Sequence, residues 1–168
     1  MVISPPDRGG RHRFKGEAMS LNDEVELLRN IPLFANLEPS KIKLLAFTSE
    51  RLTFRAGQNL CVQGDMGDAA FIIMEGSADV IVHIDNKDTA VAKVGKHDIV
   101  GEIAILCDVP RTATVRASSE VTALRISKDL FFRLIREFPS MAVVIMRELA
   151  QRLERTTSQL SRALGRAG

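Results

Sequence analysis

Apolar residues in the middle of the chain fall into short runs separated by Gly and Asp. Short apolar runs that are rich in Val, Ile and Phe are typical of β-strands. Glycines at 57, 64, 67 and 76 stand between the runs, where a tight corner or a positive φ is needed. Many short strands at near-regular spacing predict an antiparallel barrel or roll. The predicted strands cover residues 52–54, 60–62, 71–74, 80–84, 91–94, 112–115 and 121–127.

The apolar pattern before residue 49 has a helical period. Leucines and Val25 recur at helical spacing from Leu21 to Asn30, with Asn22 as a possible N-cap. The segment 31–34 interrupts this pattern because it contains a proline. A second helix follows with Pro39 in its first turn. We expect three side chains of this second helix to point inward: Ile42, Leu44 and Leu45.

Helical periodicity returns after the last predicted strand. Ser127 is placed to cap a helix that runs through Phe138, and Pro139 breaks it. A long helix then extends from about Ser140 to Leu164. The whole pattern predicts an α+β fold, in which an antiparallel β-roll is flanked by N-terminal helices and a C-terminal helix pair.

Small, apolar and threonine side chains in the long helix recur at alternating steps of four and three residues. This spacing gives the narrow stripe of a coiled-coil seam. The helix is longer than a small roll can cover, so we expect a parallel homodimer through it. The alternative is that the stripe packs against its own domain. The stripe consists of Ala142, Met146, Leu149, Leu153, Thr156, Leu160 and Ala163.

Bulk composition is that of an ordinary globular domain. The chain has 168 residues, 45% of them hydrophobic, and a formal net charge of +2. So small a charge, without Trp or Tyr for base stacking, argues against direct nucleic-acid binding. No apolar run is long enough to span a membrane, and the N-terminus lacks the apolar core of an export signal. We therefore expect a cytoplasmic protein without a membrane contact.

We expect three regions along the chain. Residues 1–20, rich in Pro, Gly and Arg, read as a disordered tail. The basic cluster from Arg11 to Lys15 either contacts an acidic partner or is merely solvated. Residues 21–139 form the roll with its flanking helices, and residues 140–168 form the long C-terminal helix.

Side chains that often carry catalysis or metal binding are scattered. Cys61 and Cys107 lie in apolar contexts without metal spacing and read as buried free thiols. The histidines at 12, 83 and 97 have no ligand partners at metal spacing, so no metal is expected. No nucleophile elbow or kinase motif occurs, so the chain is not expected to be an enzyme. The acidic glycine-rich segment 64–68 is expected to be a turn.

The segment 101–115 carries most of the functional information. It places one carboxylate, Glu102, and one guanidinium, Arg111, in a largely apolar run that opens on Gly101. A charge in apolar surroundings is costly unless it is paired or meets a ligand. The guanidinium fork suits a phosphate, backbone N–H groups after a Gly suit an anion, and a carboxylate can accept a hydrogen bond from a sugar hydroxyl. The alternative is a structural ion pair between Glu102 and Arg111.

Two motifs in this segment resemble the phosphate-binding cassette of cyclic nucleotide-binding domains. They are Gly101-Glu102-Ile103-Ala104 and Pro110-Arg111-Thr112-Ala113-Thr114-Val115. The resemblance implies a β-roll of the jelly-roll-like, double-stranded β-helix kind. It also implies that Glu102 binds the ribose 2′-hydroxyl and Arg111 the cyclic phosphate, with backbone N–H groups of 101–104, Thr112 and Ala113 completing the cradle. Val100 departs from the family, where an aromatic residue usually precedes the Gly-Glu pair, and this affects packing more than chemistry.

The resemblance gives weaker guidance on the base. A hydroxyl at Thr112 is compatible with either cAMP or cGMP. The segment 149–157 resembles the dimer helix of the catabolite-activator branch of the family, which implies that Thr156 and Thr157 cap the base. The alternative is that Thr156 only sets the register of the seam. We expect cAMP to be preferred over cGMP.

The leading hypothesis is therefore a non-catalytic cyclic nucleotide sensor that acts in signal transduction. Ligand binding would move the C-terminal helices about a hinge near Pro139 and so act on an effector that the sequence does not identify. One alternative is a sensor-domain fragment of a catabolite-activator-type transcription regulator, because no room for a DNA-binding helix-turn-helix remains before Gly168. Another alternative is a degenerate roll that serves only as a dimerisation module. A binding titration separates the last alternative from the first.

Overall fold

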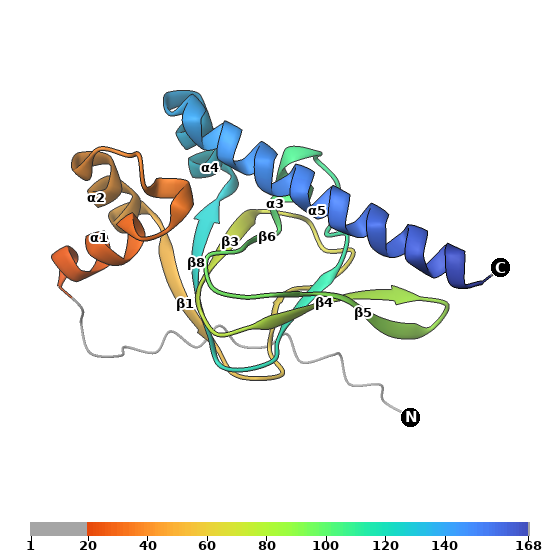
Figure 1. Ribbon diagram of the computed structural model, residues 1–168. Helices are drawn as coiled ribbons and strands as arrows, with labels where there is room; N and C mark the ends of the chain where they lie inside the picture. Colours follow the sequence, from red (N-terminus) through yellow and green to blue (C-terminus); the bar gives the residue numbers. More distant parts are fainter. Residues whose placement is uncertain (1–19, 168) are drawn as a thin grey trace.

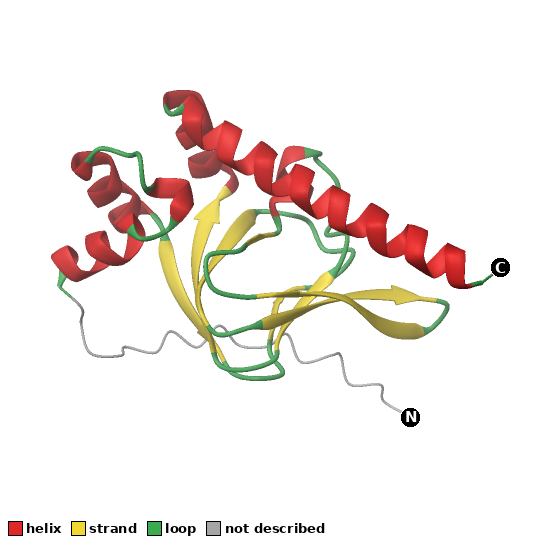
Figure 2. Ribbon diagram, viewed as in Figure 1, coloured by secondary structure: helices red, strands yellow, loops and turns green. Residues whose placement is uncertain are grey.

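The computed structural model describes residues 20–167, and these form a β-roll with helices at its ends (Figures 1 and 2). The strands make two four-stranded sheets, with orders β1-β8-β3-β6 and β2-β7-β4-β5. Every strand pair is antiparallel. The α+β roll predicted from the sequence is confirmed. The strands are β1 (Glu50–Phe54), β2 (Asn59–Cys61), β3 (Ala69–Glu75), β4 (Ala78–Ile84), β5 (Lys87–Val94), β6 (Ile99–Val100), β7 (Thr114–Ala117) and β8 (Val121–Ser127).

The central strands β3 and β8 are buried on both faces, and they divide the apolar interior into two cores. Side chains alternate between the faces of a strand. Phe71 and Ile73 of β3 therefore enter a core inside the roll, whereas Ile72 and Met74 enter a second core beneath the helices. This explains why the 71–74 run is apolar throughout instead of alternating.

The N-terminal helices close one end of the roll. They are α1 (Leu21–Arg29), the 3-10 turn η1 (Pro32–Phe34) and α2 (Pro39–Thr48). The expectation that Asn22 caps the first helix is wrong. Ser20 is the cap, and its hydroxyl accepts from the backbone N–H of Asp23, whose carboxylate accepts in return from Ser20.

One inward residue of α2 was also predicted wrongly. Ile42 and Leu45 are fully buried, but Leu44 is 44% exposed. Successive residues on a helix point 100° apart, so one short helix cannot turn 42, 44 and 45 toward a single layer.

The connection between β6 and β7 contains a helix that the sequence patterns did not predict. Helix α3 (Glu102–Leu106) begins directly after Gly101, which adopts a left-handed conformation with φ +80°. The next strand, β7, starts at Thr114 and not at residue 112 as expected. Backbone contacts with the β2–β3 loop hold this stretch instead: the N–H of Arg111 donates to the Asp65 carbonyl, and the N–H of Gly64 donates to the Arg111 carbonyl.

Two helices follow the roll. Helix α4 (Lys128–Glu137) is capped by Ser127, as predicted, and α5 (Pro139–Arg166) follows after a one-residue break. Pro139 stands in the first turn of α5, where its missing N–H costs nothing. Met141 and Ile145 anchor the start of α5, and the helix then crosses the roll and extends beyond it (Figure 1).

Some sequence-based expectations lie outside the described residues. The expected tail and its basic cluster fall almost wholly within residues 1–19. Of the helices in the part that the structure does describe, none combines the length and the apolar character needed to cross a bilayer.

Candidate functional site

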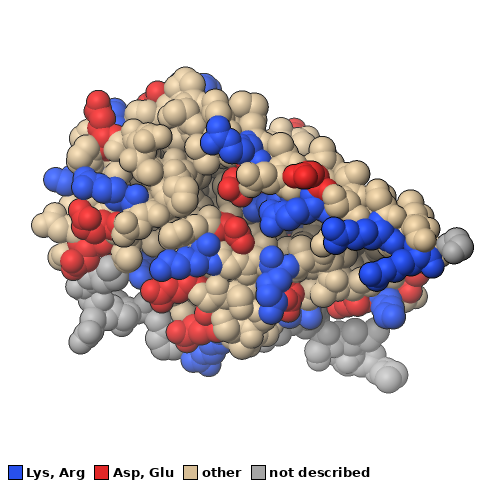
Figure 3. Space-filling view, in the orientation of Figure 1, with Lys and Arg blue, Asp and Glu red and all other residues tan. Residues whose placement is uncertain are grey.

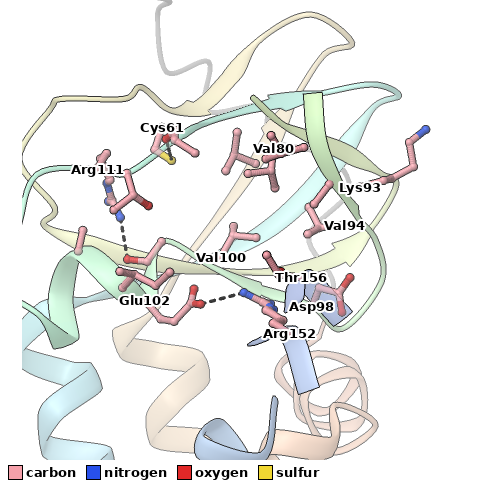
Figure 4. A pocket seen from close by; sticks show the side chains of 18 of the residues that line it. Cys61, Val80, Lys93, Val94, Asp98, Val100, Glu102, Arg111, Arg152 and Thr156 are labelled. Atoms are coloured by element: carbon pink, nitrogen blue, oxygen red, sulfur yellow. Dashed lines mark hydrogen bonds and ion pairs between the residues drawn. The ribbon is translucent and has the colours of Figure 1, made fainter. Parts of the chain in front are cut away.

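A cavity of about 400 Å³ lies between α3, the β4–β5 hairpin and α5 (Figure 4). Arg111 and Cys61 stand on one side of it, and Thr156, Asp98 and Lys93 stand on the opposite side (Figure 4). The lining is mixed, with apolar side chains from the roll and polar ones from α3 and α5. It comprises Cys61, Val80, Val91, Ala92, Lys93, Val94, Asp98, Val100, Gly101, Glu102, Ile103, Ala104, Arg111, Thr112, Ala113, Val115, Arg152, Arg155, Thr156 and Gln159.

Gly101 allows the Arg111 guanidinium to approach the start of α3 closely. Its φ of +80° disfavours other residue types, and a Cβ built on it would lie 2.5 Å from Nη1 of Arg111. The turn at Gly101 starts α3, and the first N–H groups of a helix have no partner inside the helix. The sequence thus places backbone donors on the cavity wall at residues 102–104.

Arg111 is only 5% exposed, and carbonyl groups fix its guanidinium. Nη1 donates to the Gly101 carbonyl at 2.9 Å, and Nη2 donates to the Ala69 carbonyl at 2.7 Å. The nearest carboxylate is that of Asp68, 3.5 Å from Nη2. The guanidinium also lies over the Phe71 ring, 5.9 Å from its centroid. Among residues 20–167, only the mostly exposed carboxylate of Asp68 is thus paired with this buried cation.

Glu102 is 1% exposed, and its partner comes from α5. Arg152 donates from Nη1 to the Glu102 carboxylate at 2.8 Å, and its Nη2 donates to the Ile99 carbonyl. Burial raises the pKa of the Glu102 carboxyl, while Arg152 and Arg111 act in the opposite direction. The carboxylate therefore carries an unfavourable desolvation that its partners only partly offset.

The structure rules out the ion pair between Glu102 and Arg111 considered from the sequence. Among the described residues no ion pair joins them, since Glu102 pairs with Arg152 and Arg111 with Asp68. Both face one cavity from different elements. Their charges are thus available to a single bound molecule.

Most of the site residues predicted from the sequence line this cavity. Gly101, Glu102, Ile103 and Ala104 come from α3 and its cap, Arg111, Thr112 and Ala113 from the loop before β7, and Thr156 from α5. Thr157 is not among the lining residues, and its side chain is exposed on α5.

Sequence reasoning missed the polar lining outside the cassette. Arg152, Arg155 and Gln159 enter from α5, and Lys93 and Asp98 from β5 and the loop that follows. The positions 152, 155, 156 and 159 recur at helical spacing, so this polar face was visible in the sequence once Thr156 was assigned to the cavity.

The two cysteines differ from the expectation of buried thiols. Cys61 is half-buried on the cavity wall, and burial raises the pKa of its thiol. Cys107 is exposed just after α3, because the helix ends there and the following residues turn outward. Within residues 20–167, no cluster of three or more His, Cys, Asp or Glu side chains is arranged to hold a metal ion.

Positive charge gathers along the C-terminal half of α5. On the face shown in Figure 3, Lys and Arg side chains concentrate on the side where α5 and the β4–β5 hairpin lie. From residue 152 onward, α5 contains four arginines, at positions 152, 155, 162 and 166. A positive field around the cavity favours the approach of an anionic ligand.

Comparison with known proteins points to one family. The sequence model described as Cyclic nucleotide-binding domain matches residues 51–138. A CRP-like cAMP-activated global transcriptional regulator of Mycobacterium tuberculosis is 28% identical over 137 residues, covering 81% of this chain and 61% of the relative. A cAMP-dependent protein kinase regulatory subunit of Emericella nidulans is 32% identical over 108 residues, covering 64% of this chain and 26% of the relative. The chain thus spans less than two thirds of either relative.

Solved structures agree with this result. The catabolite activator protein of Thermus thermophilus superimposes with a TM-score of 0.67 at 26% identity, covering 77% of this chain and 62% of that one. A cyclic nucleotide-binding-like protein of Brucella abortus is 32% identical with a TM-score of 0.56, covering 68% of this chain and 98% of that one.

Proposed function

The chain belongs to the cyclic nucleotide-binding domain family, and from this premise we propose that it is a non-catalytic sensor of cyclic AMP. It binds cAMP in preference to cGMP and passes the binding event to its C-terminal helices. One observation carries the proposal: a buried cation, Arg111, and a buried anion, Glu102, face the same cavity without pairing with each other.

The cyclic phosphate binds at Arg111. Each Nη of a guanidinium carries two protons, and one proton on each of these two nitrogens is used by a carbonyl. The second protons form a fork that suits two phosphate oxygens. Backbone N–H groups of residues 101–104, Thr112 and Ala113 complete the cradle. The carbonyl contacts fix the guanidinium in advance, which reduces the entropy lost on binding.

The ribose binds at Glu102, whose carboxylate accepts from the 2′-hydroxyl. This contact involves α5 directly, because Arg152 already occupies the same carboxylate. The ligand therefore either shares Glu102 with Arg152 or shifts it. Ligand binding then shifts the equilibrium between positions of α5. The size of this shift is set by the difference between the ligand's affinities for those positions.

The base occupies the side of the cavity opposite Arg111, where Thr156 stands (Figure 4). A threonine hydroxyl both donates and accepts, so it can bond the edge of a purine. Thr157 lies outside this protomer's cavity and contributes only if a second chain packs along α5. We keep cAMP as the preferred ligand and the homodimer as part of this proposal, together with the cytoplasmic location expected from the sequence.

Side-by-side titration calorimetry with cAMP and cGMP tests the proposal. The native chain is expected to bind cAMP more tightly than cGMP. Arg111→Lys keeps the charge but loses the fork, so affinity for both should fall about 10- to 100-fold, the worth of one charge-assisted hydrogen bond. Arg133→Lys, on the exposed face of α4, is the matched control and should bind like the native chain.

Two results would overturn the proposal. Unchanged affinity in Arg111→Lys removes this residue from the phosphate site. Absence of binding to either nucleotide in the native chain favours a roll that serves only for dimerisation.

A second candidate is the sensor part of a CRP-like transcription regulator. The alignment with the Mycobacterium tuberculosis regulator runs over 81% of this chain, which favours this candidate. The reading frame downstream of Gly168 tests it: a helix-turn-helix there supports the candidate, and its absence leaves a sensor that acts on a separate effector.

A further inference from the structure

A row of charged side chains connects Arg111 to residues outside the cavity lining. The Asp68 carboxylate accepts from Nη2 of Arg125 at 2.8 Å and stands 3.5 Å from Nη2 of Arg111. The other end of the Arg125 guanidinium is 3.9 Å from the Glu50 carboxylate. Neither Arg125 nor Asp68 is among the cavity-lining residues. The Asp68 carboxylate is thus shared unequally between two arginines. Its shorter contact is with Arg125, which lies outside the cavity lining.

The strands fix this arrangement. Arg125 on β8 is registered opposite Phe71 on β3, and the Phe71 ring lies beneath the Arg111 guanidinium. Asp68 immediately precedes β3, and its backbone carbonyl accepts from the N–H of Lys128, the first residue of α4. Arg125 is also mostly covered, with 18% of its side chain exposed. The pairing of β3 with β8 therefore sets the position of Arg125 relative to Asp68.

We propose that Arg125 is a positioning residue for anion binding, which holds the Asp68 carboxylate back from Arg111 and so keeps the Arg111 guanidinium available to the ligand phosphate. The inference rests on the proposed role of Arg111 and adds a residue that does not touch the ligand.

The physical reason is a competition between two anions for one cation. A buried guanidinium is costly without a counter-charge, so Asp68 stabilises the empty site. A carboxylate committed to Arg111 alone would also cancel the charge that attracts the phosphate. Arg125 takes the closer contact with Asp68 and reduces this cancellation. Its removal leaves the full negative charge of Asp68 acting on Arg111.

Double-mutant calorimetry with cAMP tests the inference. Arg125→Leu should weaken cAMP binding about fivefold, the effect of a partly exposed charge pair. Arg125→Lys keeps a cation near Asp68 and should bind close to the native level. Asp68→Asn in the Arg125→Leu background removes the competing charge and should restore most of the lost affinity. A purely structural role of Arg125 predicts no such rescue.

The controls separate this inference from the proposed function. Arg116→Leu removes a cation from strand β7 of the other sheet, outside the cavity lining, and should leave affinity near the native value. The cAMP-to-cGMP affinity ratio should stay constant in Arg125→Leu, because the phosphate is common to both. If Arg125→Leu does not fold, as judged by circular dichroism, Arg125→Gln takes its place.

Unchanged affinity in the Arg125 variant, or a loss that Asp68→Asn does not reverse, overturns the inference while the role of Arg111 stands. Unchanged affinity in Arg111→Lys overturns the proposed function itself.

Discussion

At the scale of single residues, the site depends on two ions held in a largely apolar roll. Each has its own partners: carbonyl groups and Asp68 for Arg111, and the α5 residue Arg152 for Glu102. The free-energy cost of removing a charge from water is offset only by good ion-pair geometry and added hydrogen bonds. Neither ion is therefore an ordinary element of a stable core, and both are explained best by a ligand.

The raised pKa of Glu102 predicts a pH dependence of stability. Burial raises the pKa above the ordinary value of 4.5, so the folded state holds the proton more tightly than the unfolded state. The stabilisation of the folded state by protonated Glu102 is fully present below pH 4.5. It is lost as the pH rises through the raised pKa of Glu102 in the folded state. Without ligand, the free energy of unfolding of the native chain minus that of Glu102→Gln should therefore fall as the pH rises above about 4.5.

Urea denaturation of both proteins at several pH values measures this difference. Glu137→Gln, at an exposed position on α4, should show no such trend. A difference that stays flat or grows with pH contradicts the assignment.

A pair of turn glycines separates backbone strain from steric contact. Gly57 and Gly76 have φ values of +90° and +88°, but only at Gly76 would a Cβ meet another atom, 2.0 Å from the Glu120 carbonyl oxygen. Gly57→Ala should cost about 1 kcal/mol for the left-handed backbone. Gly76→Ala should cost about 1–3 kcal/mol more, since the turn between β7 and β8 must move. Equal losses in thermal or urea unfolding would contradict this difference.

At the scale of elements, α5 joins two roles in one helix. Its first turns pack on the roll through Met141 and Ile145, and Leu149 still contacts that core. Three other residues of the expected seam, Met146, Leu153 and Leu160, are exposed at seven-residue spacing. Leu149 of the stripe therefore packs on its own domain, and Met146, Leu153 and Leu160 are available to a partner. Such a surface favours the proposed parallel homodimer.

Charge placed in this open stripe should dissociate the proposed dimer. Leu153→Lys and Leu160→Lys should each shift the chain to monomer in sedimentation velocity runs, because a buried ammonium in the seam is costly. Ser158→Lys places the same charge on the other side of α5 and should leave the dimer intact. A native chain that sediments as a monomer, or a dimer that tolerates both lysines, would argue against a seam on α5.

At the scale of the whole molecule, the site connects the roll to its C-terminal helices. Glu102 follows the cap of α3, and Arg152 lies midway along α5. Helix α5 is otherwise anchored by few buried side chains, so a small change in free energy can alter its position. In the proposed binding mode, the ligand and α5 thus compete or cooperate at the Glu102 carboxylate.

Hydrogen exchange tests this connection across the molecule. Saturating cAMP should slow amide exchange in residues 138–157, because the ligand stabilises one position of α5. The Arg111→Lys variant at the same concentration should show little protection. Protection confined to α3 and the cavity strands would contradict coupling through the C-terminal helices.

The local patterns of the sequence determined the roll, the α4–α5 pair and the cassette. Strand runs, turn glycines and the cap at Ser127 depend on neighbouring residues, so they could be read along the chain. The resemblance of the segment 101–115 also placed Glu102 and Arg111 at one site, and both residues line the same cavity. The predictions of the α1 cap and of the inward side of α2 were wrong, because a short helix can be placed in several similar registers along the sequence.

Only the tertiary structure decided which charges meet. Arg152 reaches Glu102 across 50 positions, and Arg125 reaches Asp68 across 57. No local period encodes such contacts, because they follow from strand register and from the path of α5 over the cavity. The sequence thus pointed to two charged residues that line one cavity, Glu102 and Arg111, and the packing of distant elements set their partners.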